Sequence, residues 1–510
     1  MVMVMAQPQV PEQRPTVVLV AFYNIKALGV RYLETAFTKA GYRVVTVFFK
    51  QFNSVHPAPA TEKELELMCD VVRREKPVLV GLSVMSSMYL DSVHALIEAL
   101  QRSNLGPIAC GGAYASLEPE HFLDRGIPFV TRLDGEVPLV QLAEALRTGR
   151  DWHDTPSLCY REGGQNVINP IGGMTNDVDS YGIPTIQCSN ACLIDKDTVV
   201  SGDPQLSLLS YEVIASRGCP FTCSYCSCVN LHRLYPEGIR GVRTRSVKSI
   251  IEELKEAKRL CKKMVFVHFY DEIFPNLPGW VDEFVEEYHK HIDLPFTIWT
   301  HPKMTDPDVL KKLRKVGLTE VIMGIQTGST HIRQDIFHRY ETNEDVVEAT
   351  RRIHESGVFW ATYDFMLQHP FETLEDLKDS YRLAKELKGS YELQLHGLNF
   401  LPGTDIVPMA IEAGHYTAEE MDQVMYAPMD QQFKVFWKQP NSRESQLWYD
   451  LIYLWQFPRY RSRCLEYEKD PIQYESRILQ DYEKAQKLYR LRYLYKKSRV
   501  VLKSIRQRIF

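Results

Sequence analysis

The chain has 510 residues, of which 45% are hydrophobic and 25% are charged, a composition typical of globular proteins. This length exceeds one ordinary core, so we expect two or three domains. A formal net charge of −5 argues against a general nucleic-acid-binding protein, and the sequence contains no apolar run of about 18 residues that would predict a membrane-spanning helix.

The N-terminal residues 1–15 lack the charged segment and long apolar run of a secretory signal, and we predict a disordered lead-in. The eleven cysteines are an odd number in a long chain, which suits a reducing compartment better than a disulfide framework. We therefore expect a cytoplasmic protein.

Residues 16–150 alternate short apolar runs with amphipathic segments. Strands are predicted at 16–23, 42–49, 77–84, 107–112 and 128–132, and helices lie between them, for example at 30–41 and at 61–76 with Thr61 as N-cap. This alternation predicts an α/β fold with a doubly wound, Rossmann-like parallel sheet. Ligands of such sheets bind at the carboxyl ends of the strands.

Small and hydroxyl-bearing residues follow three of these strands. Glycines let a backbone approach a large flat ligand and hydroxyls supply directed hydrogen bonds, although the same residues are common in ordinary turns. The candidates are Ser83, Ser86 and Ser87 after the third strand, Gly111, Gly112, Ala113 and Tyr114 after the fourth, and Gly135 and Glu136 after the fifth.

Residues 151–210 are rich in Gly, Pro, Asn and Asp and are predicted as a linker. A strand at 211–218 follows, and directly after it Cys219, Cys223 and Cys226 form a C-x₃-C-x₂-C motif. Structural zinc sites usually take two close pairs of ligands, whereas three cysteines on one loop suit a [4Fe–4S] cluster with one iron left open. We predict that Cys228 is a bystander. For the pair Cys188 and Cys192, a second metal site and ordinary apolar packing both stay open.

Residues 211–414 continue the alternation of strands and helices. After the strand at 211–218, strands are predicted at 264–271, 296–301, 320–327, 361–367 and 392–400. Six parallel strands predict a partial (βα)₆ barrel of the TIM type, whose chemistry lies at the C-terminal rim. Polar residues such as His301 and Asp364 end these strands, although loop residues are polar in most proteins.

Residues 415–510 are predicted as a helical C-terminal domain with many aromatic residues. From Lys484 to Phe510 there are ten Lys or Arg residues and no Asp or Glu. A solvated helix and peripheral contact with the inner, anionic face of a membrane both account for this basic tail. Nucleic acid is the weaker alternative, because no second basic patch supports it.

Three segments, GLSVMSS, ACGGAYASLEPEHFL and RLDGEVPLVQLAEAL, resemble the cobalamin-binding (B12-binding) domain at the front of many radical SAM enzymes. The cysteine motif, with Tyr225 before its third cysteine, is the signature of radical SAM enzymes. The resemblance covers about residues 16–413 and implies that the candidates after the three strands bind cobalamin and that S-adenosyl-L-methionine (SAM) takes the open iron. The loop NIKALG has no His where many cobalamin domains carry a cobalt ligand, which implies binding without a histidine lower ligand.

The resemblance also implies contacts with SAM. Tyr225 would lie on the adenine side, and Tyr270 and Asp271, in the segment FYDEIF, would touch the SAM amino group. Gln326, in MGIQTGS, stands where Glu is usual, which puts a charge-based role in doubt. Arg333 is a candidate for the SAM carboxylate, with a solvated helix residue as the equal alternative.

Two turn segments carry the rest of the resemblance. HPFETLEDL is similar to a family turn, with His369 and Phe371 replacing its two glycines, and FLPGTDI matches the turn after the sixth strand.

The activity that the resemblance implies is reductive cleavage of SAM to a 5′-deoxyadenosyl radical, which abstracts hydrogen from an unactivated carbon, followed by methyl transfer from methylcobalamin. The alternatives are cyclisation, rearrangement or carbon–carbon coupling on a lipid or tetrapyrrole, a non-enzymatic cofactor-binding sensor, and a radical SAM enzyme with an empty front domain. The implied partners are a small-molecule or lipid substrate and an electron donor such as flavodoxin or ferredoxin. The sequence identifies neither the substrate nor a catalytic acid or base.

Overall fold

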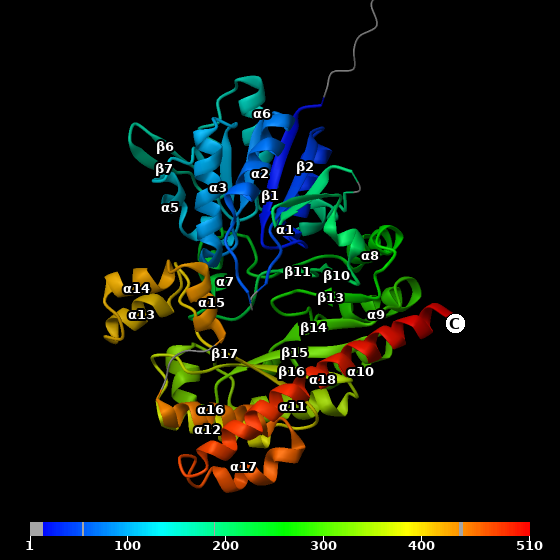
Figure 1. Ribbon diagram of the computed structural model, residues 1–510. Coiled ribbons are helices and arrows are strands. Elements are labelled where there is room, and N and C mark those ends of the chain that lie inside the picture. Colours follow the sequence, from blue (N-terminus) through cyan, green and yellow to red (C-terminus); the bar gives the residue numbers. More distant parts are fainter. Residues whose placement is uncertain (1–13, 54–55, 188, 438–441, 510) are drawn as a thin grey trace, which may run out of the picture.

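The computed structural model describes residues 14–53, 56–187, 189–437 and 442–509. Two sheets with their helices follow one another along the chain, and a group of helices ends it (Figure 1). The lead-in predicted at 1–15 falls almost entirely outside the described residues, and so does Cys188. Among the helices within the described ranges, none combines the length and apolar character needed to cross a membrane.

The N-terminal sheet contains the five predicted strands, all parallel, in the order β5-β4-β3-β1-β2 with helices on both faces (Figure 1). This arrangement confirms the doubly wound fold. Thr61 caps α2 as predicted, because its hydroxyl accepts the Glu64 N–H. The elements are β1 (Thr16–Phe22), α1 (Leu28–Lys39), β2 (Arg43–Phe49), α2 (Glu62–Glu75), β3 (Leu79–Ser83), α3 (Leu90–Arg102), β4 (Ile108–Gly111), α4 (Ala113–Leu117), α5 (Pro119–Leu123), β5 (Phe129–Thr131) and α6 (Pro138–Thr148).

The segment 151–210, predicted as a linker, instead extends this sheet at both edges. β6 (Leu158–Glu162) and β7 (Gln165–Ile168) form a hairpin beside β5, and β8 (Ala191–Asp195) and β9 (Thr198–Ser201) form another beside β2. Each hairpin has a tight two-residue turn with positive φ. The strands are only four or five residues long, so turn residues dominate the local sequence pattern.

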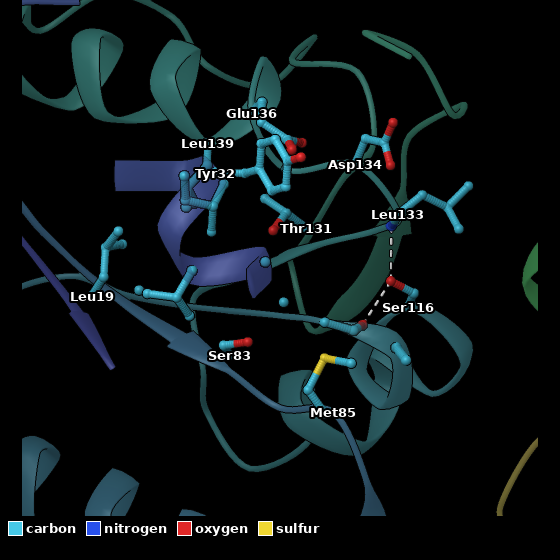
Figure 2. A pocket seen from close by; sticks show the side chains of 18 of the residues that line it. Leu19, Tyr32, Ser83, Met85, Ser116, Thr131, Leu133, Asp134, Glu136 and Leu139 are labelled. Carbon is cyan, nitrogen blue, oxygen red and sulfur yellow. Dashed lines mark hydrogen bonds between the residues drawn. The ribbon is translucent and has the colours of Figure 1, made fainter. Parts of the chain in front are cut away.

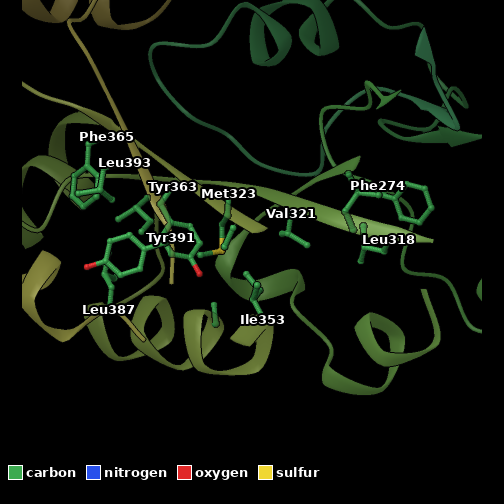
Figure 3. Packing of buried hydrophobic residues seen from close by; sticks show 14 of the residues in the cluster. Phe274, Leu318, Val321, Met323, Ile353, Tyr363, Phe365, Leu387, Tyr391 and Leu393 are labelled. Carbon is green, nitrogen blue, oxygen red and sulfur yellow. The ribbon is translucent and has the colours of Figure 1, made fainter. Parts of the chain in front are cut away.

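The second sheet has six parallel strands whose spatial order is their order in the sequence, which confirms the partial (βα)₆ barrel. The outward side chains of these strands, such as Met323 and Phe365, are buried in one hydrophobic cluster with helix residues such as Ile353 (Figure 3). The elements are β10 (Ser210–Val213), β11 (Ser216–Arg217), α7 (Ser227–Arg233), β12 (Arg243–Thr244), α8 (Val247–Leu260), β13 (Phe266–Phe269), α9 (Trp280–His291), β14 (Phe296–Thr300), α10 (Pro307–Lys315), β15 (Leu318–Gln326), α11 (Asn343–Glu355), β16 (Trp360–Met366), α12 (Leu374–Glu386) and β17 (Glu392–His396).

The C-terminal region is helical, as predicted. It contains α13 (Ile406–Glu412), α14 (Ala418–Met425), α15 (Met429–Trp437), α16 (Arg443–Trp455), α17 (Arg461–Tyr467) and α18 (Glu475–Ile509). The long helix α18 crosses the barrel where its strands begin. Lys496 forms an ion pair with Glu320 of β15 and lies 3.8 Å from the carboxylate of Glu392 in β17. Part of the predicted basic face therefore contacts the protein's own barrel.

One buried ion pair attaches the segment 151–210 to the front domain. The guanidinium of Arg31, in α1, donates to both carboxylate oxygens of Asp203 at 2.5 and 2.8 Å, and both side chains are 1% exposed. The backbone N–H groups of Gln187 and Gln205 also donate to Asp203. A buried charge is tolerated only when its partner is present.

We expect that Asp203→Ala lowers the free energy of unfolding by about 3–5 kcal/mol, because Arg31 is left buried without a counter-ion. The midpoint of chemical denaturation, followed by circular dichroism, measures this change. Asp70→Ala is the control, since Asp70 and its partner Arg73 are both more than half exposed and this variant should keep the parent midpoint. Equal shifts in the two variants would contradict the prediction.

Candidate functional site

The three motif cysteines lie on the loop between β11 and α7, just beyond the end of β10. Burial, with a contribution from nearby charges, raises the pKa of Cys219 to about 11 and the pKa of Cys226 to about 12. Within the described residues, no three His, Cys, Asp or Glu side chains converge closely enough to hold a single ion. A cubane binds each cysteine through a different iron, so its ligands stand further apart than those of one ion. Three cysteines on this one loop suit a [4Fe–4S] cluster with one iron left open.

Backbone contacts hold this loop in place. Gly218 has a φ of 99°, and a Cβ there would lie 2.0 Å from the carbonyl oxygen of Gly241, so only glycine fits before Cys219. The Ser224 N–H donates to the Phe337 carbonyl at 3.1 Å, and the Ser224 carbonyl accepts the Ile406 N–H at 3.0 Å. The loop is thus fixed between the turn after β15 and the start of α13.

A chain of side chains connects the cluster loop to the barrel rim. Phe221 stacks on His301 with ring centroids 3.7 Å apart, and Nε2 of His301 lies 3.4 Å from the Glu341 carboxylate. Arg339 donates to Glu341 at 2.6 Å and to the Tyr225 hydroxyl at 3.3 Å. Sequence reasoning named Tyr225 and His301 but missed Arg339 and Glu341, whose only local signal is an Arg-x-Glu triplet in a loop.

The FYDEIF segment begins at the last residue of β13, and its next two side chains differ in exposure. Tyr270 is 55% exposed and meets the edge of Trp299, with ring centroids 4.8 Å apart. Asp271 is buried instead, and its carboxylate accepts the N–H groups of Ala215 and Ser216 and the Ser216 hydroxyl at 2.6 to 3.1 Å. Asp271 thus fixes the backbone that leads to the cluster loop, and its contact with SAM stays a prediction.

Glu272, a polar residue at the end of its predicted strand, lies near the motif cysteines. Its side chain is exposed, and its charge acts together with burial to raise the pKa of the Cys219, Cys226 and Cys228 thiols. Since the thiols stand beside it, Glu272 is better placed than Asp271 to meet a cationic group bound at the cluster.

Two glutamines on the rim take the left-handed conformation. Gln326 ends β15 with a φ of 71°, and Gln368 follows β16 with a φ of 58°. Gln368 directly precedes the segment HPFETLEDL, in which His369 and Phe371 are not among the positive-φ residues. Non-glycine residues held in this region are uncommon and occur most often at functional sites.

Arg333 lies in the π-helical turn Ile332–Ile336 and is 1% exposed. Its guanidinium donates to the Thr327 carbonyl and, at 2.5 Å, to Oδ1 of Asn343. Burial lowers the pKa of Arg333 to about 10. The structure thus gives Arg333 a role in the loop after β15, and its contact with the SAM carboxylate stays a prediction.

A cavity lies at the carboxyl ends of the front-domain strands, with about 1090 Å³ of empty space that includes open solvent (Figure 2). Its lining includes most of the residues that the sequence singled out for cobalamin, namely Ser83, Gly111, Gly112, Ala113, Gly135 and Glu136. Ser86, Ser87 and Tyr114 do not line it. The Ser86 hydroxyl accepts the Met88 N–H, while Ser87 and Tyr114 are buried.

Other cavity residues could not be recognised from local patterns. Tyr32 comes from α1, and Asp134 follows β5, while Ile214, Leu231 and Tyr235 belong to the barrel domain. The cavity therefore has walls from both domains. The front-domain residues Tyr32, Ser83, Asp134 and Glu136 surround the open space in Figure 2.

Arg217 joins the cavity to the cluster loop. It lies in β11, two residues before Cys219, and its guanidinium reaches Asp134 at 3.1 Å and Glu136 at 2.6 Å. The same guanidinium lies 4.7 Å from the ring centroid of Tyr32. One partly buried cation thus spans from the strand before the cluster motif to the cavity wall.

The lining of the cavity fits a large, flat group such as cobalamin. Gly81 stands in mid-strand on β3, and a Cβ there would lie 2.9 Å from Leu19 and 3.6 Å from Leu139, both of which line the cavity. The NIKALG loop sends Lys26 to an ion pair with Glu212 in the barrel. Cobalamin binding without a histidine lower ligand stays a prediction.

Comparison with known proteins agrees with this division of the chain. Residues 14–143 match the model of the B12 binding domain, and residues 213–384 match the model of the radical SAM superfamily. An uncharacterised methyltransferase of Pyrococcus horikoshii is 25% identical over 344 residues, which cover 67% of this chain and 71% of that protein.

A second curated relative is the anaerobic magnesium-protoporphyrin IX monomethyl ester cyclase of Cereibacter sphaeroides. It is 24% identical over 381 residues, which cover 70% of this chain, and the chain spans about half of the cyclase's length, with 55% covered.

Two solved structures share the fold. The radical SAM methyltransferase TsrM of Kitasatospora setae, with cobalamin and a [4Fe–4S] cluster bound, has a TM-score of 0.62 at 18% identity and covers 78% of this chain and 75% of its own. The cobalamin-dependent radical SAM enzyme OxsB, with aqua-cobalamin and SAM bound, has a TM-score of 0.62 at 15% identity. The match covers 92% of this chain and 72% of the OxsB chain. With a B12 binding domain, a radical SAM domain and a cavity between them, the chain belongs to the cobalamin-dependent radical SAM enzymes.

Proposed function

We propose that the protein methylates an unactivated carbon of a small-molecule substrate, using SAM, a [4Fe–4S] cluster and cobalamin. The observation that carries this proposal is the shared cavity: Arg217 and Leu231, on either side of the cysteine motif, line the same space as the strand ends of the B12 binding domain. With cobalamin at these strand ends and the cluster on the motif, both cofactors would border one region, as a transfer from one cofactor to a radical generated by the other requires.

When bound, the cluster supplies the electron that splits SAM into methionine and a 5′-deoxyadenosyl radical, and methylcobalamin supplies the methyl group. The residues of this chain hold and orient these groups. Cys219, Cys223 and Cys226 would bind three irons, and the stack of Phe221 on His301 keeps their loop against the barrel rim. An electron donor of the flavodoxin or ferredoxin class would reduce the cluster.

A second candidate function keeps both cofactors but forms a ring or a carbon–carbon bond. The similarity to the magnesium-protoporphyrin cyclase favours this reading, whereas the similarity to the Pyrococcus horikoshii methyltransferase favours methylation. Label from methyl-labelled SAM separates them, because only methylation places the label in the product.

We also propose peripheral contact of α18 with an anionic membrane. Leu491, Leu494 and Tyr495 are 65%, 62% and 53% exposed on this helix, and the exposed Lys487 and Lys497 flank them. An exposed apolar strip bordered by lysines suits the interface of a bilayer. This strip is separate from Lys496, which contacts the barrel.

Cluster removal tests the main proposal. The reconstituted protein with reductant and methyl-labelled SAM should form 5′-deoxyadenosine and, with an extract of metabolites, a labelled product detected by mass spectrometry. Cys223→Ala should lose the cluster absorbance and both products, because three ligands are needed. Cys228→Ser is the matched control and should retain all three signals. A parent protein that forms no 5′-deoxyadenosine would refute the enzyme reading.

Glu272→Gln should raise the SAM concentration needed for half-maximal 5′-deoxyadenosine formation by about tenfold, because a carboxylate that meets the cationic SAM amino group is lost. Cluster absorbance should stay at the parent value. Glu283→Gln, on the barrel helix α9, is the control and should behave like the parent protein. If Asp271→Asn raised the SAM requirement while Glu272→Gln did not, our choice of Glu272 would be wrong.

Replacing both Leu491 and Leu494 by Ser should reduce sedimentation with vesicles that contain phosphatidylglycerol by roughly tenfold, since two apolar side chains no longer enter the bilayer interface. Leu479→Ser is the control, because Leu479 is 44% exposed on the same helix but lies outside the strip. Unchanged sedimentation of the double variant would remove the membrane proposal.

A further inference from the structure

The interior of the barrel is hollow. Along β15 the side chains from Glu320 to Gln326 alternate between partly exposed and buried. The buried set packs in the hydrophobic cluster with the outer helices, so the partly exposed set faces inward. His268 in β13, Asp364 in β16 and His396 in β17 continue the partly exposed set. Solvent therefore reaches the inner face of the sheet.

Most carboxylates on this inner face have a fixed cation. Glu212, in β10, pairs with Lys26 from the front domain. Glu320 and Glu392, near the starts of their strands, share Lys496 of α18. These two lysines come from elements outside the barrel sheet, and together they neutralise the three glutamates.

Asp364 is the exception. Its Oδ1 atom is out of contact with solvent and accepts no hydrogen bond from the described residues, while the side chain as a whole is 23% exposed. Nε2 of His396 lies 4.0 Å from Oδ1, and burial lowers the pKa of His396 to about 4, so this ring is neutral near pH 7. Burial, with repulsion from Glu392 and Glu320, raises the pKa of Asp364 to about 7. A carboxylate in this setting lacks a counter-ion.

Solvent reaches the Asp364 side chain, which is 23% exposed. Its register partner on β15 is Gly324, and the side-chain amide of Gln326 lies over that glycine, 2.6 Å from where a Cβ would stand. Trp299 and Tyr270 form an aromatic wall on the inner side of β14 and at the end of β13, and both are at least partly exposed. Aromatic faces attract cations, as a carboxylate does.

We propose that the barrel interior binds its substrate through a protonated amine, with Asp364 as the counter-ion and the aromatic wall beside it. This inference rests on the proposed function, because it places the substrate of that reaction in the barrel. A purely apolar chain would leave Asp364 without a partner, and a porphyrin with acidic side chains would add a like charge. The site thus favours an amine-bearing small molecule over both alternatives.

Three probes of similar size and different charge test this inference on the full-length protein with cluster, cobalamin and SAM bound. They are 2-phenylethylamine, 2-phenylethanol and 3-phenylpropanoate, and calorimetric titration measures their dissociation constants. We expect the amine to bind at least about tenfold more tightly than the alcohol, because only the amine pairs with a carboxylate.

Substitutions locate the effect. Asp364→Asn should abolish the preference for the amine, and Asp364→Glu, which keeps the charge, should retain most of it. Asp379→Asn is the matched control, since Asp379 is 42% exposed on the outer helix α12 and pairs with Arg382. Cluster absorbance shows that each variant is folded.

Equal affinity for amine and alcohol in the parent protein, tighter binding of the propanoate, or an amine preference that survives Asp364→Asn would each overturn the inference. Failure of the proposed function is a separate result. It would appear as a parent protein that forms no 5′-deoxyadenosine from SAM, whatever its preference among the three probes.

Discussion

The guanidinium of Arg217 sets the relation between the two halves of this protein. It is held by Asp134 and Glu136 of the front domain and lies against the ring of Tyr32, while its own backbone belongs to the short strand before the cysteine motif. Arg243, which is 1% exposed, donates to the same Asp134, so two cations of the barrel domain meet the acidic pair of the front domain. These two cations therefore hold the strand before the cluster loop against the cavity wall.

The same dependence on charge recurs inside the barrel. Lys26 comes from the loop after β1, and Lys496 comes from the C-terminal helix, yet both complete ion pairs with glutamates of the barrel sheet. The barrel thus needs the front domain and α18 to neutralise its interior. At Asp364 no ion pair with a fixed lysine or arginine of the described residues forms, and the side chain stays partly exposed to the barrel interior; a carboxylate in that position suits a cationic ligand.

Periodicity predicted the architecture well, because long strands and helices carry many residues of one pattern. All five front strands and all six barrel strands lie close to their expected positions. Residues 151–210 were predicted as a linker, although they contain four short strands. Each strand has too few residues to show a clear pattern of side chains, so the turn residues dominate the local sequence. Asp271 and Glu272 show a different limit: neighbouring side chains beyond a strand end can point in opposite directions, and a motif of letters does not say which one faces the ligand.

The sequence by itself determined the cluster loop. The three cysteines stand on one short segment, so local chemistry is enough to recognise the site. The cavity wall, the anchoring of the loop by Arg339 and Glu341, and the charge left unpaired at Asp364 were decided only by tertiary structure. Each depends on contacts between elements far apart in the chain, and the burial that gives such contacts their strength exists only after the chain has folded.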